Sequence, residues 1–193
     1  MTRNGVLCLE GDWEEGLARN RSLIPVLQLI KSQSNIPFIH RTASTRDEFR
    51  RVIEEWAKAK YSKFPILYLG FHGAPGALKI GKEIISIGDL HEFAGKGKNR
   101  VIHFGACETL KVPPTVLNQF MKSTRFTAIC GFRTEVDWLH SCALEILVLE
   151  ELSRRKISIS SITLFKKNVM RRAGSLAREL GFHIWSRGNL YRD

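Results

Sequence analysis

The sequence lacks any apolar run long enough to cross a membrane as a helix. No stretch approaches the roughly 18 consecutive apolar residues that such a helix requires. The first apolar run, Val6 to Leu9, follows a polar start and is too short for the apolar region of a secretory signal peptide. We therefore expect a cytoplasmic protein that does not bind membranes.

Cysteine is scarce and shows no pattern. The 193 residues include four cysteines, and no two of them form a CxxC pair. Disulfide frameworks and structural zinc sites usually need several closely spaced cysteines, so we expect neither. The glycine-rich loops that bind nucleotides, Gly-x-x-x-x-Gly-Lys-Ser/Thr and Gly-x-Gly-x-x-Gly, do not follow any predicted strand. These absences argue against a nucleotide-binding enzyme, and we expect no cofactor and no metal site.

Acidic residues are few compared with basic ones. The chain has 30 Lys and Arg against 19 Asp and Glu, a formal charge of +11 at pH 7. From Glu151 to Asp193 there are ten basic and three acidic residues. Such segments are usually solvated helix faces, and no nucleic-acid motif accompanies this one. The charge still permits nucleic acid or an acidic protein as a partner.

Short apolar runs predict the strands of a sheet that is buried on both faces. With 193 residues and 44% hydrophobic content, the chain fits a single domain, residues 1–193. Apolar runs bounded by glycine and turn residues predict parallel strands covered by helices. The runs are 6–9, 36–40, 66–71, 101–104, 127–131 and 182–185, with helical patterns between them. Residues 77–80 and 83–87 predict a small β-hairpin after the third strand. The order predicts a doubly wound α/β fold.

Two of these strands end on side chains that are capable of covalent catalysis. His72 and Gly73 follow the third strand, and Gly105, Ala106 and Cys107 follow the fourth. Ligands of such sheets bind outside the carboxyl ends of the strands, where an imidazole and a thiol can face one another. A free cysteine is only a few per cent thiolate at neutral pH, so a nucleophilic cysteine needs a neighbouring imidazole. From these residues alone, a purely structural histidine and cysteine remain the alternative.

Both strand ends resemble the signatures of the caspase-like (clan CD) cysteine peptidases, which include caspases, metacaspases, separase, gingipains and bacterial CHAT domains. The two segments are ILYLGFHG (Ile66 to Gly73) and VIHFGACET (Val101 to Thr109). The second is most similar to the CHAT form, Ser-Ala-Cys-Glu-Thr, with Gly105 in place of serine, and the caspase run Gln-Ala-Cys-Arg-Gly is absent. The resemblance implies a three-layer caspase-hemoglobinase-like fold with a mostly parallel six-stranded sheet, and a role in bacterial stress or phage defence.

The resemblance also implies roles for individual residues. His72 would be the general base and acid, Cys107 the nucleophile, and the N–H groups of Gly73 and Cys107 the oxyanion hole. The residue before the scissile bond would bind beside the ends of the first and fifth strands. The carboxylates at these two ends are Glu10 and Asp12, and Glu135 and Asp137. They would favour Arg or Lys, as in metacaspases and separase. The alternative is that Asp137 only caps its helix and that Glu10 is solvated.

Two functions remain open at this point. The first is a cysteine endopeptidase that cleaves a protein or peptide and is regulated by a partner, oligomerisation, processing or the hairpin. The second is a catalytically inactive module whose basic C-terminal third binds nucleic acid or an acidic protein. Trp13 and Trp138 either wall a substrate groove or pack in the core, and we expect His103 to be buried and hydrogen-bonded. The sequence does not identify the group that orients His72.

Overall fold

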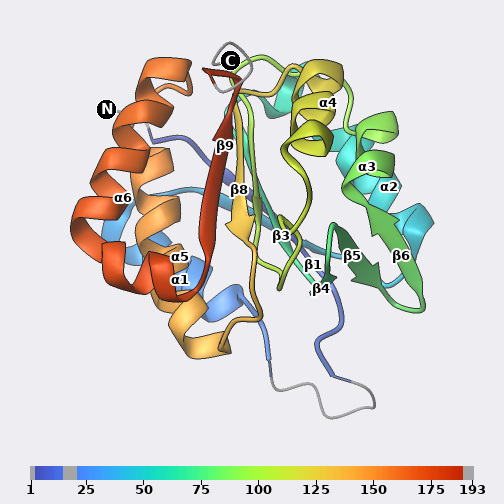
Figure 1. Cartoon of the computed structure of the whole chain (residues 1–193), viewed down its shortest axis with the longest axis horizontal. Helices are drawn as coiled ribbons and strands as arrows, with labels where there is room; N and C mark the ends of the chain where they lie inside the picture. Colours follow the sequence, from blue (N-terminus) through green and yellow to red (C-terminus); the bar gives the residue numbers. More distant parts are fainter. Residues whose placement is uncertain (1–2, 15–20, 189–193) are drawn as a thin grey trace.

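A central sheet covered by helices on both faces dominates the structure, a computed structural model shown in Figure 1. The structure describes residues 3–14 and 21–188. The strands of the sheet are β1 (Val6–Glu10), β2 (Phe38–Thr42), β3 (Ile66–Gly70), β7 (Val101–Phe104), β8 (Ala128–Phe132) and β9 (Phe182–Ser186). Their order is β2-β1-β3-β7-β8-β9, and only the β8–β9 pair is antiparallel. The predicted six-stranded, mostly parallel sheet is confirmed.

The helices form one layer on each side of this sheet. One layer holds α1 (Ile24–Ser34), α5 (Trp138–Ser153) and α6 (Ile159–Glu179). The other holds α2 (Arg46–Trp56), α3 (Ile87–Phe93) and α4 (Pro114–Thr124), and a 3-10 turn, η1 (Ala59–Tyr61), follows α2. In β1, Leu7 and Leu9 face the second layer while Val6 and Cys8 face the first, because successive side chains of a strand alternate. Burial on both faces explains the unbroken apolar runs. In the part of the chain that the structure describes, no helix is long and apolar enough to span a membrane.

The segment after β3 forms a second, smaller sheet. Its strands are β4 (His72–Ala74), β5 (Ala77–Ile80) and β6 (Glu83–Ser86), paired in antiparallel fashion in that order. The predicted hairpin is present as β5 and β6, and His72 opens a third strand beside it. Only Phe71, which is buried, separates β3 from β4. The small sheet therefore continues directly from the carboxyl end of a central strand.

Strand β2 and the C-terminal helices differ most from the sequence prediction, and most other strand ends differ by one residue. Strand β2 begins at Phe38 rather than at residue 36. The preceding residues end helix α1, with Asn35 in the left-handed region (φ 52°), and the first parallel hydrogen bond is accepted by the Pro37 carbonyl from Val6 N. Between the last two strands the sequence pattern predicts two C-terminal helices, 161–172 and 175–180, but the structure has one element, α6, with a non-helical kink at Ala173 (φ −137°). The predicted break therefore appears as a kink.

Gly181 gives a test of this packing. It follows α6 with a φ of 58°, and a Cβ atom there would lie 2.8 Å from Cγ2 of Thr134. We expect Gly181→Ala to lower the free energy of unfolding by about 1–2 kcal/mol, because the left-handed region is costly for alanine. Gly188→Ala is the matched control, since its Cβ would make only ordinary contacts. Equal urea unfolding curves for the two variants would contradict this assignment.

Candidate active site

The backbones of Gly73 and Cys107 are in direct contact. A Cβ atom on Gly73 would lie 1.9 Å from the carbonyl oxygen of Cys107 and 2.8 Å from its nitrogen. Only glycine permits this approach. Strands β3 and β7 are parallel neighbours, so their carboxyl ends bring the His72-Gly73 and Cys107 segments to the same edge of the sheet. The contact fixes the spacing between the two segments.

His72 is held by the backbone of Trp13. The imidazole is exposed, and its Nε2 lies 2.9 Å from the carbonyl oxygen of Trp13. A carbonyl oxygen only accepts hydrogen bonds, so Nε2 carries the proton and Nδ1 is left with a free lone pair. The Trp13 ring also contacts the imidazole edge-on, with centroids 5.5 Å apart. Trp13 is thus the orienting group that the sequence did not identify.

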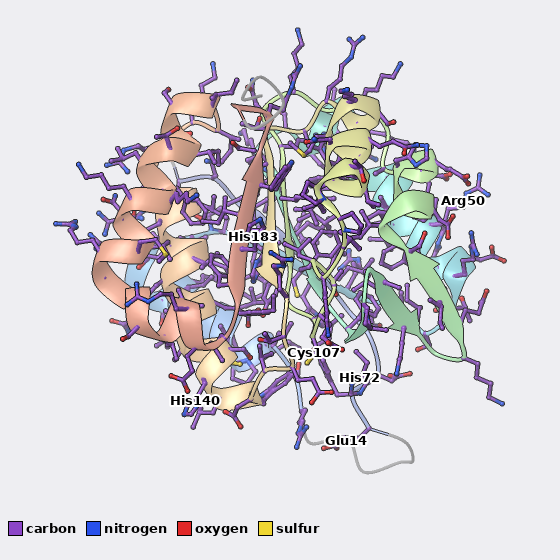
Figure 2. All side chains as sticks on the ribbon, in the orientation of Figure 1. Glu14, Arg50, His72, Cys107, His140 and His183 are labelled. Atoms are coloured by element: carbon purple, nitrogen blue, oxygen red, sulfur yellow. The ribbon has the colours of Figure 1, made fainter. Side chains whose placement is uncertain are left out.

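The side chains of His72 and Cys107 line one cavity of about 160 Å³. Cys107 is half-buried, is a free thiol, and has its Sγ 4.0 Å from the carbonyl oxygen of Val136. Figure 2 shows the two labelled side chains at the same end of the molecule, beyond the carboxyl ends of the central strands. The structure therefore brings the predicted imidazole and thiol together.

Two indole rings wall this cavity. Trp13 and Trp138 both line it and pack edge-to-face, with ring centroids 4.6 Å apart. Arg21 lies at the same cavity, with its guanidinium carbon 5.9 Å from the Trp138 ring centroid and its Nε 3.5 Å from a Glu14 oxygen. The two tryptophans therefore pack against each other and also wall the cavity, so both interpretations from the sequence describe part of their role.

Glu10 is buried in a network of hydrogen bonds and does not line the Cys107 cavity. Its Oε1 accepts from Trp13 Nε1 (2.5 Å) and Leu23 N (2.7 Å). Its Oε2 accepts from Ser22 Oγ (3.0 Å) and pairs with His40 Nε2 (2.6 Å). Burial alone would raise the pKa of Glu10, but the hydrogen bonds from His40, Trp13, Leu23 and Ser22 lower it below its ordinary value. This carboxylate holds Trp13 after β1 and the residues Ser22 and Leu23 that lead into α1.

The other three predicted substrate carboxylates also lie outside the cavity lining. Asp12 accepts a hydrogen bond from Ser44 Oγ (2.8 Å), and Asp137 caps α5 by accepting from His140 N (2.9 Å). Glu135 and Asp137 are exposed, whereas the intervening Val136 lines the cavity. Asp137, the N-cap of α5, has an extended backbone (φ −68°, ψ 139°). The structure does not bring these carboxylates together with His72 and Cys107.

Among the described residues, Glu145 of α5 is the one carboxylate that lines the cavity. Its side chain is nearly inaccessible, with Oε2 accepting from Tyr68 Oη (2.7 Å) and Oε1 bonded to His103 Nε2 (2.9 Å). A Cβ on Gly105 would lie 2.7 Å from Oε1, so this glycine makes room for the carboxylate. A glutamate within an otherwise apolar helix was the available sequence signal, and sequence reasoning missed it.

His103 is buried and hydrogen-bonded, as predicted. Its Nε2 bonds Glu145 and its Nδ1 lies 3.4 Å from the Cys130 sulfur. Burial lowers the pKa of His103, but Cys130 and then Glu145 raise it, and the net value is about 10. The raised pKa favours the protonated ring, which suits its contact with the Glu145 carboxylate behind the cavity.

The basic C-terminal third divides into two groups. Arg154 forms ion pairs with Glu150 and Glu151 at the end of α5, and Arg172 of α6 pairs with the same two glutamates and so joins α5 to α6. The exposed basic residues on α6 include Lys166, Lys167 and Arg171. Arg192 lies outside the described residues. In the described ranges, no group of three or more His, Cys, Asp and Glu side chains is placed to hold a metal ion.

The His103–Glu145 pair predicts a pH dependence of stability. An unfolded histidine has a pKa of about 6.5, and the folded value is about 10. The stabilisation is therefore complete below about pH 6.5 and is lost as the pH rises towards 10. We expect the free energy of unfolding to fall over this window, and to fall less in His103→Gln, in urea titrations. Parallel pH profiles for the two proteins would show that His103 does not hold its proton.

The fold is that of the caspases. The chain matches pro-sf-caspase-1 with a TM-score of 0.57 and 13% identity, over 95% of this chain and 91% of that one. It matches caspase-1 from Spodoptera frugiperda with a TM-score of 0.53 and 14% identity, over 96% and 87%. At such identities the likeness shows the fold alone, and it confirms the predicted caspase-like sheet flanked by helices. No curated protein matches the chain. A family model matches residues 3–186, and the chain belongs to that family, DUF6642, a family of unknown function.

Proposed function

We propose that this protein is a caspase-like cysteine endopeptidase with Cys107 as nucleophile and His72 as general base and acid. The observation that carries the proposal is the backbone contact between Gly73 and Cys107, because it sets both side chains on one cavity. The caspase fold supports the same conclusion, since a protein or peptide substrate suits this fold.

The proposed mechanism follows from the orientation of the imidazole. Because Nε2 of His72 faces the Trp13 carbonyl, Nδ1 is the atom that takes the thiol proton from Cys107. The thiolate attacks the peptide carbonyl carbon, and the oxyanion accepts hydrogen bonds from the N–H groups of Gly73 and Cys107. His72 then protonates the leaving amine. A water molecule, deprotonated by His72, hydrolyses the thioester and releases the acid.

We propose Arg or Lys as the residue before the scissile bond, with Glu145 as its carboxylate. Each Glu145 oxygen receives one hydrogen bond, from Tyr68 or His103, and an ionised carboxylate can accept about four in total. A basic side chain could occupy the remaining acceptor positions with charge-assisted bonds. Arg21 at the cavity is paired with Glu14, which reduces its repulsion of such a substrate.

The match of Ala106 to Thr109 with the CHAT signature supports a CHAT-type peptidase rather than a caspase proper. By the same likeness we propose a cytoplasmic effector of bacterial stress or phage defence, controlled by a protein partner. The alternative is an inactive module that binds nucleic acid, and the exposed Lys166, Lys167 and Arg171 on α6 favour it. Salt-dependent nucleic-acid binding by a protein without peptidase activity would support this alternative.

Removing either proposed catalytic side chain tests the proposal. We expect Cys107→Ala and His72→Ala each to lower peptide cleavage by on the order of a thousandfold or more, with the circular dichroism spectrum unchanged. Cys8→Ala is the control, because this thiol is fully buried in the core and burial raises its pKa. Cleavage that persists in Cys107→Ala would exclude the mechanism.

Specificity has its own test. We expect wild-type protein to cleave an Arg or Lys peptide faster than the matched Leu peptide, and Glu145→Gln to reduce this ratio by about 10- to 100-fold, the value of a charge-assisted hydrogen bond. The ratio of kcat/KM cancels any general structural damage from the substitution. A wild-type ratio near one would reject the basic preference. If the ratio falls in Asp137→Asn but not in Glu145→Gln, the basic preference comes from the strand-end carboxylates instead.

A further inference from the structure

We propose that Glu10 is a positioning residue for catalysis, because its buried carboxylate fixes Trp13 and Trp13 in turn orients His72. The inference rests on the proposed function of His72 and Cys107. It differs from the role in substrate binding that the sequence predicted for Glu10. Glu10 touches neither the cavity beside Cys107 nor the reacting atoms, and it acts only through Trp13.

A continuous set of contacts connects Glu10 with the catalytic imidazole. Glu10 Oε1 accepts the indole N–H of Trp13 at 2.5 Å. The carbonyl oxygen of the same tryptophan lies 2.9 Å from His72 Nε2, and its ring packs on the imidazole and on Trp138. The position of the Trp13 side chain therefore also sets the position of its carbonyl oxygen. Among the described residues, Glu10 is the only side chain that accepts a hydrogen bond from the Trp13 indole N–H.

The backbone that carries the Glu10 side chain is held firmly within the central sheet. It stands at the end of β1, in the interior of the sheet between β2 and β3. Its carbonyl oxygen accepts from Ala43 N at 3.0 Å, and the next amide, Gly11 N, donates to the Gly70 carbonyl at 2.8 Å. The side chain is 3% exposed. Because Glu10 is held firmly, its carboxylate can fix the position of Trp13.

The chemistry of the network specifies a carboxylate rather than an amide. Trp13 Nε1, Leu23 N and Ser22 Oγ all donate to Glu10, and His40 Nε2 lies within hydrogen-bond distance of it. Glutamine has nearly the same shape and can keep a carbonyl oxygen at the Oε1 position, but it is neutral, and its NH₂ group replaces the acceptor Oε2 that faces Ser22 and His40. Glu10→Gln therefore keeps the packing while it removes the charge that strengthens the hydrogen bond from Trp13.

The consequence for catalysis concerns the thiolate of Cys107. The Trp13 carbonyl fixes the His72 tautomer and accepts from the imidazolium once that ring has taken the thiol proton. If the carbonyl moves, the imidazolium loses this acceptor, and the thiolate–imidazolium pair becomes less favourable. Loss of the Glu10 network should therefore lower the reactivity of Cys107 even where no substrate is bound.

The test is the pH–rate profile for alkylation of Cys107 by iodoacetamide in the full-length protein, with modification assigned by mass spectrometry. We expect Glu10→Gln to slow alkylation at neutral pH by about tenfold, a cost near that of one hydrogen bond, and to lower kcat with little change in KM. Trp13→Phe removes the indole N–H donor and keeps a smaller aromatic ring, so it should act in the same direction. The double variant should be no slower than the slower single variant, because both substitutions break one connection.

Glu151→Gln is the matched control. Glu151 is a buried carboxylate that accepts hydrogen bonds from Asn168 and Arg172 and does not line the cavity, so its loss should reduce stability and leave Cys107 reactivity unchanged. Wild-type Cys107 that reacts as slowly as in His72→Ala would overturn the proposed function itself. Activated wild-type Cys107 with unchanged rates in both Glu10→Gln and Trp13→Phe would overturn only the role of Glu10. If Glu10→Gln does not fold, the alkylation rate of Cys107 in Trp13→Phe alone decides whether this connection positions His72.

Discussion

The close approach of two backbones, at Gly73 and Cys107, is the constraint on which the candidate site depends. It arises because β3 and β7 are parallel neighbours and end at the same edge of the sheet. A side chain at residue 73 would occupy the position of the Cys107 carbonyl oxygen, so the approach requires glycine. Once the two segments are in contact, the imidazole of residue 72 and the thiol of residue 107 share a cavity without any further adjustment of the fold.

Two buried carboxylates support this edge from the side of the sheet that α1 and α5 cover. Glu10 holds Trp13, which in turn holds His72. Glu145 pairs with His103 and with Tyr68 behind the cavity. Buried charges are tolerated only where paired and hydrogen-bonded, and both carboxylates meet this condition. The candidate site therefore combines an exposed imidazole and a half-buried thiol with a surrounding network of buried hydrogen bonds.

The sequence predicted those features that depend on local pattern. Continuous apolar runs identified the central strands because both faces of a parallel sheet are buried, and the glycines beside His72 and Cys107 marked the strand ends. Features that depend on long-range contacts were not predictable. The hydrogen bonds that bury Glu10 come from residues up to 30 positions away, including His40. Glu135 was a candidate by position, yet it is exposed and its neighbour Val136 lines the cavity. The start of β2 was wrong by two residues because α1 ends in a left-handed turn at Asn35.

The most direct measurement is a crystal structure of the protein after reaction with a peptidyl chloromethyl ketone. The account predicts a thioether bond to Sγ of Cys107, with the ketone oxygen within hydrogen-bond distance of the N–H groups of Gly73 and Cys107. His72 Nε2 should still face the Trp13 carbonyl oxygen, and the side chain before the ketone should occupy the cavity walled by Trp138. An adduct on another residue, or a Cys107 adduct whose oxygen points away from both N–H groups, would contradict the account.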